Sequence, residues 1–96
     1  MGEREAYIKK MEAKLQEWNA KISEYEAKAK SSQADIHAEY DRRVEELKKK
    51  RDDAAAELDK LRLAGDEAWH DIKNGFESAW SSLGKAFESA SEKFKR

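Results

Sequence analysis

Two histidines are the first residues to weigh for chemistry, because imidazole is both a common metal ligand and a general base. His37 and His70 are the only histidines, and the chain has no cysteine. Asp41 follows His37 by four residues. Glu67 and Asp71 flank His70. Neither histidine has a second histidine or a carboxylate pair at a metal-ligand spacing. We therefore interpret both as solvated residues on helix faces, and we expect no metal site.

Adjacent carboxylates are the next candidates. Glu45–Glu46 and Asp52–Asp53 stand beside lysines and arginines in a strongly charged stretch. Acid–base catalysis needs a carboxyl whose pKa is shifted by a pocket, and nothing in this stretch predicts a pocket. The serines of the second helical region lack a base in any recognisable nucleophile arrangement: Ser78, Ser81, Ser82, Ser89 and Ser91. We expect no catalytic residue, no cofactor and no small-molecule substrate, and hence no enzyme.

The charge balance argues against a nucleic-acid partner. Twenty basic residues stand against twenty-one acidic ones, which gives a net charge of −1. Nucleic acid and anionic membranes attract surfaces with a clear basic excess. The run Lys48–Arg51 points around most of a helix and is bracketed by acidic pairs, which indicates a solvated, salt-bridged surface. Arg51 alone falls on an apolar stripe, where its guanidinium could reach a carboxylate across a helix interface.

These residues belong to a long stretch without helix breakers. There is no glycine between Gly2 and Gly65, and the chain has no proline. Glutamates four residues before lysines or arginines add helix-stabilising ion pairs. Apolar residues recur at steps of three or four, as on one side of a helix that another helix covers. The stripe is Ile8, Met11, Leu15, Trp18, Ile22, Tyr25, Ala29, Ser32, Ile36, Tyr40, Val44, Leu47, Arg51, Ala54, Leu58 and Leu61. The pattern predicts a helix over residues 3–63.

The pattern changes at Ala64–Glu67. Gly65 suits the left-handed position just past a helix end, and Asp66 can cap a following helix. We therefore predict a turn at 64–66 and a second helix over 66–95. Large apolar and aromatic residues of this helix fall within one narrow arc. They are Trp69, Ile72, Phe76, Trp80, Leu83, Phe87 and Phe94. This aromatic stripe is expected either to pack against the long helix or to face lipid.

The fold class expected is all-α, with residues 1–96 forming a single helical coiled-coil module. The shorter C-terminal helix runs antiparallel to the long one and covers only residues 34–63. The N-terminal part of the stripe then lacks a partner in its own chain, which predicts an exchanged antiparallel dimer. Its self-association residues are Ile8, Met11, Leu15, Trp18, Ile22 and Tyr25. The alternative is a break near residues 31–33, where Ser32 and Asp35 imitate a capping box, giving a monomeric three-helix bundle.

The function expected from this architecture is non-enzymatic. We expect a self-associating coiled-coil structural or interaction protein, a homodimer in its simplest form. The alternative is reversible binding to a lipid surface through helix 66–95, because large apolar groups on one face and a serine-rich polar face suit an interfacial helix. The first twenty residues contain no continuous apolar segment, so we expect neither a signal peptide nor a transmembrane helix, and a cytoplasmic location.

The chain also resembles a family of small, Lys/Glu/Ala-rich bacterial coiled-coil proteins, mostly uncharacterised, some of which are described as stress-response proteins. The resemblance is carried by three segments: YIKKMEAKLQEWNAKI at Tyr7–Ile22, VEELKKKRDDAAAELDKL at Val44–Leu61, and AWHDIKNGFESAWSSLGKAFESASEKFK at Ala68–Lys95. It covers nearly the whole chain. It implies a non-enzymatic coiled-coil protein of a bacterium, with an association to stress and with no catalytic residues to carry over.

Overall fold

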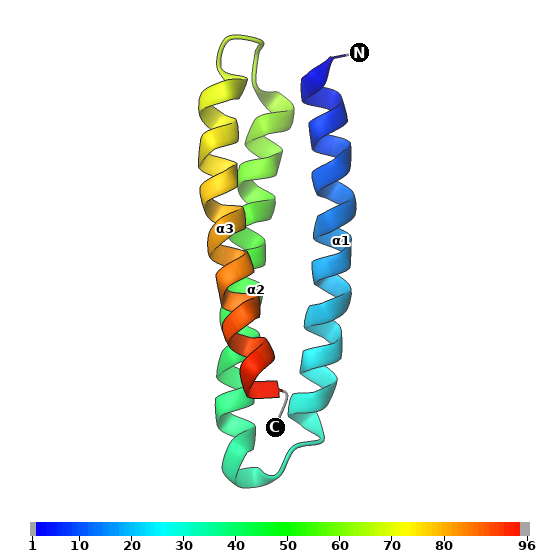
Figure 1. The fold of residues 1–96 in the computed structure, drawn as a ribbon, viewed down its shortest axis with the longest axis vertical. Coiled ribbons are helices and arrows are strands. Elements are labelled where there is room, and N and C mark those ends of the chain that lie inside the picture. The colour runs from blue at the N-terminus through cyan, green and yellow to red at the C-terminus, as the bar shows by residue number, and fades with distance from the viewer. Residues whose placement is uncertain (1, 95–96) are drawn as a thin grey trace.

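The computed structural model shows a bundle of three α-helices. It describes residues 2–94, with side chains at all of these positions except 34, 35, 93 and 94. The helices are α1 (Glu3–Lys30), α2 (Ala34–Leu63) and α3 (Trp69–Phe94). They lie side by side in a rod of 51 × 18 × 17 Å, and α2 runs antiparallel to the other two (Figure 1). The predicted all-α fold is confirmed.

The core is a single apolar strip along the axis of the bundle. All three helices contribute to it, and α2 packs closely on both of its neighbours. Its most deeply buried large side chains are Phe76, Ile22, Leu47, Leu58, Leu61 and Leu83. Charged residues occupy the outer faces, as the three-to-four spacing of the apolar residues requires. Ile36 departs from the predicted stripe, because its side chain is 39% exposed at the start of α2.

The helix predicted over 3–63 is interrupted at residues 31–33 in this structure. Ser31 lies near helical geometry with φ −93° and ψ 0°, and Gln33 is extended with φ −68° and ψ 153°. The serine hydroxyls explain the break: Ser31 Oγ donates to the carbonyl of Lys28 at 3.1 Å, and Ser32 Oγ donates to that of Ala29 at 2.6 Å. Such bonds offer the last carbonyls of a helix an alternative to further helical turns.

Ser32, which imitates a capping box with Asp35 in the sequence, is not the N-cap residue of α2. The N-cap position is occupied by Gln33, which makes no side-chain capping bond. The side chain of Asp35 lies outside the described residues. The start of α2 is therefore fixed by the turn and by packing rather than by a capping side chain.

The second reversal is longer than predicted. Ala64 is extended, with φ −73° and ψ 142°, and α3 begins only at Trp69, so that the turn covers 64–68 rather than 64–66. No described glycine has a positive φ, and the left-handed conformation expected at Gly65 is therefore wrong. A reversal spread over five residues needs no left-handed step. The carbonyl of Gly65 instead accepts the backbone N–H groups of Ala68 and Trp69, at 3.1 Å each.

Candidate functional site

The interface between α1 and α3 is built from aromatic side chains. The backbones of these two helices approach each other at few points, in contrast to the close packing of each on α2. Trp18 of α1 stacks on Phe87 of α3, with ring centroids 4.1 Å apart and an interplanar angle of 22°. Tyr25 lies 6.1 Å from Phe87, and Trp80 lies 6.3 Å from Trp18, both centroid to centroid. Aromatic rings therefore fill the space that separates α1 from α3.

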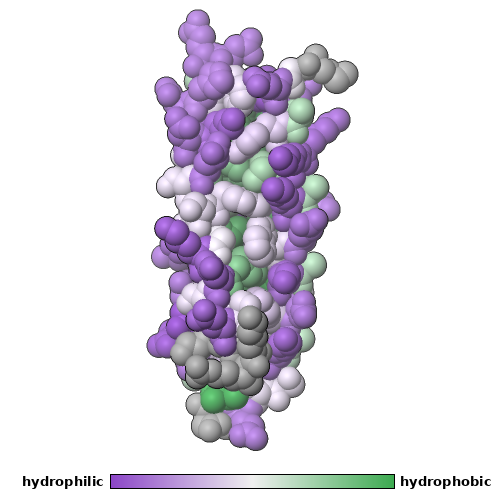
Figure 2. Space-filling view, in the orientation of Figure 1, coloured by the Kyte–Doolittle hydropathy of each residue, from purple (hydrophilic) through white to green (hydrophobic). Residues whose placement is uncertain are grey.

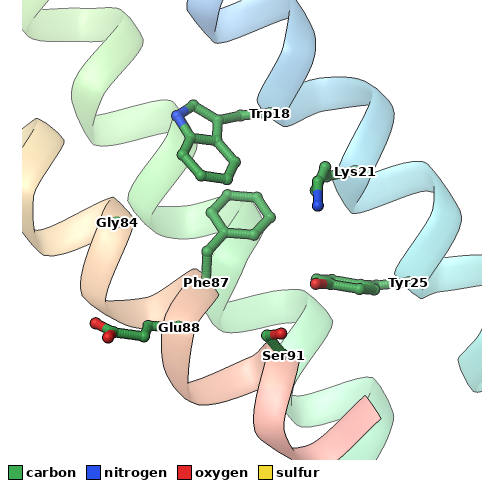
Figure 3. A pocket seen from close by; sticks show the side chains of 7 residues that line it. All are labelled: Trp18, Lys21, Tyr25, Gly84, Phe87, Glu88 and Ser91. Atoms are coloured by element: carbon green, nitrogen blue, oxygen red, sulfur yellow. The ribbon is translucent and has the colours of Figure 1, made fainter. Parts of the chain in front are cut away.

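A groove of about 270 Å³ opens beside this stack. We call it the α1–α3 groove. Its lining residues are Trp18, Lys21, Tyr25, Gly84, Phe87, Glu88 and Ser91. In Figure 3, Phe87 points from α3 toward α1 and lies below Trp18. Figure 2 shows the same face from outside, with hydrophilic side chains along both flanks and a paler, partly hydrophobic band down the middle. On the face seen in Figure 2, hydrophilic side chains are thus sparser where α1 meets α3 than on either flank.

The N-terminal half of this interface is held by Tyr7. Its ring meets Phe76 edge to face, with centroids 6.0 Å apart and an interplanar angle of 84°. The ammonium of Lys73 lies 4.7 Å above the Tyr7 ring. Partial burial, together with the neighbouring carboxylate of Glu77, raises the pKa of Tyr7 to about 12. The phenol therefore stays protonated and acts as a packing group rather than as an acid or base.

Ion pairs on the outer surface tie α1 to α2. Lys48 Nζ donates to Glu26 Oε2 at 2.7 Å. The hydrogen bond to Lys48 holds the pKa of Glu26 below its usual range, and the same bond raises the pKa of Lys48. Further along, the guanidinium of Arg62 pairs with Glu12 of α1. These contacts fix the register of α1 against α2, while α3 takes part in neither.

The position of Arg51 on the stripe predicted a contact with a carboxylate across the interface. Among the described residues, Arg51 makes no such contact. Its guanidinium pairs with its neighbour Asp52 at 2.9 Å, on the same helix. Across the interface it donates to the amide oxygen of Asn19 at 3.4 Å. The facing position on α1 holds an amide, so the contact is a weak polar one rather than an ion pair.

Arg4 anchors the first turn of α1 to the turn between α2 and α3, at the same end of the bundle. Its guanidinium donates to the carbonyl of Ala64, in the turn between α2 and α3. It also lies 4.0 Å from the carboxylate of Asp66, whose side chain is fully open to solvent. Figure 1 shows the start of α1 beside this turn. Sequence reasoning missed Arg4, because nothing local links a residue of the first turn to a loop sixty positions away.

His37 lies in the first turn of α2, close to the break at 31–33, and it is more closely bonded than the solvated helix-face residue expected from the sequence. Its ring is 40% exposed, and both nitrogens have partners. Nδ1 lies 2.6 Å from the carbonyl oxygen of Ala29, at the end of α1. Nε2 lies 2.9 Å from Oδ2 of Asp41 on the next turn of α2. The Asp41 spacing was visible in the sequence, whereas the Ala29 contact depends on the break at 31–33.

His70 differs from His37. It is exposed at the start of α3, and its ring lies beside that of Trp69 with centroids 4.3 Å apart. In the described part of the chain, no three side chains of the metal-ligating types come together. Among residues 2–94, no helix combines the length and the apolar character that a membrane span requires.

The predicted self-association residues all lie on the inner face of α1. Ile22, Met11, Tyr25 and Ile8 are buried in the core, and Leu15 and Trp18 are half-buried against it. The closed bundle therefore covers these residues within one chain. A second copy could cover them only by replacing α2 and α3 of the same chain.

The predicted aromatic stripe of α3 is also turned inward. Trp69, Phe76, Leu83 and Phe87 are buried, and Ile72 and Trp80 are half-buried. The side chain of Phe94 lies outside the described residues. Contact of this stripe with anything other than the bundle would require α1 to move away.

Comparison of the chain with known protein families, with curated proteins and with solved structures finds no match.

Proposed function

We propose that this chain is a non-enzymatic structural or interaction protein that self-associates by exchanging α1 between two copies. The observation that carries the proposal is the geometry of the turn at 31–33. Ser31 is already near helical values, and Gln33 has a helical φ and departs from a helix in ψ. A change confined to this short segment straightens α1 and α2 into one helix, and α1 then packs on the α2 and α3 of a second copy.

The contacts supporting the exchanged form are those of the closed bundle. Trp18 of one chain would stack on Phe87 of the other, and Glu26 would pair with the other chain's Lys48, so little contact energy changes. Straightening adds helical hydrogen bonds across 31–33 in place of the turn. Association in turn costs translational and rotational freedom. The balance between the closed monomer and the exchanged dimer therefore depends on protein concentration.

The sparse backbone contact between α1 and α3 further supports α1 as the exchanging helix. The α2–α3 pair packs closely along its length, whereas α1 meets α3 through side chains around the α1–α3 groove. Movement of α1 as a unit breaks its packing on α2 but only sparse backbone contact with α3, and its own hydrogen bonds stay internal to the helix. In the exchanged dimer, the α2–α3 hairpin of each chain thus stays intact, and α1 is the helix that packs on the other chain.

A pair of insertions tests the exchange. Insertion of Gly-Asn-Gly after Ser32 makes the first turn flexible and unsuited to a straight helix, so we expect a shift toward monomer. The same insertion after Gly65 alters the other turn and leaves the proportion of dimer unchanged. Light scattering coupled to size-exclusion chromatography measures both. An insertion after Ser32 that leaves the dimer as populated as before would contradict an exchange through this turn.

A second candidate function is reversible binding to a lipid surface by α3. It is favoured by the contrast between its two faces, since the buried stripe is aromatic while Asn74, Ser78 and Ser89 on the other face are exposed and uncharged. Departure of α1 would free this stripe for lipid. Vesicle flotation tests the idea with Trp80→Asp, which should abolish binding, and Ser78→Asp, which adds the same charge to the exposed face and should not. Absence of flotation with small, loosely packed vesicles would eliminate this function.

A further inference from the structure

The turn between α1 and α2 contains a contact that exists only when the bundle is closed. Ala29 and His37 are eight residues apart, and the carbonyl of Ala29 lies 2.6 Å from His37 Nδ1. In a continuous helix, eight residues correspond to a rise of about 12 Å, so this contact cannot form. The contact of His37 with Asp41 spans one helical turn and is compatible with both forms. The Ala29 contact therefore distinguishes the closed turn from the straightened helix.

The two nearest partners of the ring, Ala29 and Asp41, determine which nitrogens must carry a hydrogen, while Ser32 Oγ is a more distant contact at 3.5 Å from Nδ1. A backbone carbonyl and an ionised carboxylate are both acceptors only, so each nitrogen must carry a hydrogen to bond its partner. A neutral imidazole has one N–H, and its other nitrogen would turn a lone pair toward an oxygen. The doubly protonated ring satisfies both contacts at once. In the straightened helix a neutral ring can donate to Asp41 and leave Nδ1 to water, so that form makes no such demand.

We propose that His37 is a pH-sensitive clasp on this turn, whose doubly protonated ring donates to Ala29 and Asp41 and holds the bundle closed. Loss of one proton leaves one ring nitrogen with a lone pair that faces the oxygen of Ala29 or of Asp41. The closed turn then loses one hydrogen bond and can straighten. Acid therefore favours the closed chain, and a rise in pH through the range in which histidine titrates favours exchange. This inference rests on the proposed function, because it names what regulates the exchange of α1.

Charged groups from both helices surround the clasp. The carboxylate of Asp41 faces the ring from α2, and the carbonyl of Ala29 faces it from the last turn of α1. Lys28 and Lys30 also lie in the last turn of α1, and both of their side chains are exposed to solvent. The ring lies near the N-terminal end of α2. Within the described part of α3, no charged side chain is in ion-pair contact with the ring.

The test compares the dimer dissociation constant of the full chain at about pH 5.5 and about pH 8, on either side of the histidine titration. We expect the dimer to be about ten- to a hundredfold tighter at the higher pH, since each of its two chains gives up one charge-assisted hydrogen bond, and each such bond in a partly exposed pair contributes about three- to tenfold. His37→Ala should abolish the pH dependence, and His70→Ala, which removes the other histidine, should leave it intact. Persistence of the pH dependence in His37→Ala would overturn the clasp.

Asp41→Asn gives a sharper outcome. An amide can donate to the lone pair of Nε2 while Nδ1–H donates to Ala29, so the neutral ring then satisfies both contacts. We expect this variant to stay closed at both pH values. A dimer that tightens with pH as in the parent chain would count against the clasp.

Amide hydrogen exchange separates the clasp from the exchange of α1. The backbone N–H of Gln33, at the N-cap of α2, has no partner within that helix in the closed turn and gains one in the straightened helix, so its protection reports straightening. We expect protection of this amide, corrected for intrinsic exchange rates, to be greater at the higher pH and to lose this dependence in His37→Ala. If no dimer forms but the protection behaves in this way, the clasp stands and the exchange fails. If dimers form without any dependence on His37, the exchange stands and the clasp fails.

Discussion

Trp18 on α1 and Phe87 on α3 stack face to face, with ring centroids 4.1 Å apart, and among the side chains that the structure describes this is the closest aromatic contact between these two helices. The pair lies where the backbones of α1 and α3 are held apart by side chains. It is therefore one of the aromatic contacts that attach α1 to α3, together with Tyr7–Phe76 and Tyr25–Phe87.

The energy of this stack can be measured with a double-mutant cycle of Trp18→Leu and Phe87→Leu. We expect a coupling of about 0.5–1.5 kcal/mol in urea unfolding, the range for stacked aromatic pairs. As a control, Trp69→Leu combined with Phe87→Leu should be additive, because eighteen residues of helix place these side chains about 27 Å apart. Additivity in the Trp18–Phe87 cycle would contradict a stabilising stack.

The ion pair between Glu26 and Lys48 predicts a pH dependence of stability. The pKa of Glu26 is lowered in the folded chain by its bond to Lys48. Its contribution is therefore present at neutral pH and is lost as the pH falls through the folded pKa. We expect Glu26→Gln to lower the melting temperature at neutral pH and to melt progressively closer to the parent chain as the solution is acidified. Glu24→Gln, at an exposed position two residues earlier, serves as the control and should not reproduce this convergence.

Glycine 84 predicts a stabilising substitution. A Cβ atom built at Gly84 meets nothing within 4 Å, although the residue lies inside α3 and lines the α1–α3 groove. Gly84→Ala should therefore raise the free energy of unfolding by about 0.5–1 kcal/mol through helix propensity. At Gly75 the added Cβ would lie 3.3 Å from Glu57 Oε2, so Gly75→Ala should gain less. A lower stability of Gly84→Ala would contradict this prediction, and it would show that the absence of a side chain at residue 84 stabilises the fold.

The anchor at Arg4 predicts local rather than global loosening. Arg4→Ala removes the donor to the Ala64 carbonyl and the contact with Asp66. We expect faster amide hydrogen exchange in the first turns of α1, since helix ends open before the core does. Arg42→Ala, at an exposed position on α2, is the matched control. Equal exchange rates in Arg4→Ala and the parent chain would contradict the anchoring role.

The sequence predicted the helices better than it predicted their ends. The spacing of apolar residues follows from helical geometry, which is local, and it correctly placed residues such as Leu58 and Phe76 in the core. The break at 31–33 was harder, because the stripe keeps its phase across the serines and neither glycine nor proline marks the turn. The hydroxyl bonds of Ser31 and Ser32 to the preceding carbonyls decide it, and they compete closely with a continuing helix.

The contacts of the candidate site were less predictable than the helices. The Trp18–Phe87 stack and the Glu26–Lys48 pair join positions far apart in the sequence, and their meeting depends on the register of antiparallel helices. Spacing within one helix carries no such information. The histidine contact with Asp41 was visible as a four-residue step, but the approach of His37 to Ala29 follows only from the turn.

The molar mass of the unaltered chain over a wide range of concentrations tests the central claim, the exchange of α1, most directly. The chain has a mass of 11.1 kDa. We expect light scattering to show this mass in dilute solution and about twice this mass at high concentration, as a bimolecular exchange requires. A mass of 11.1 kDa at every concentration, before and after unfolding and refolding at high concentration, would contradict the account.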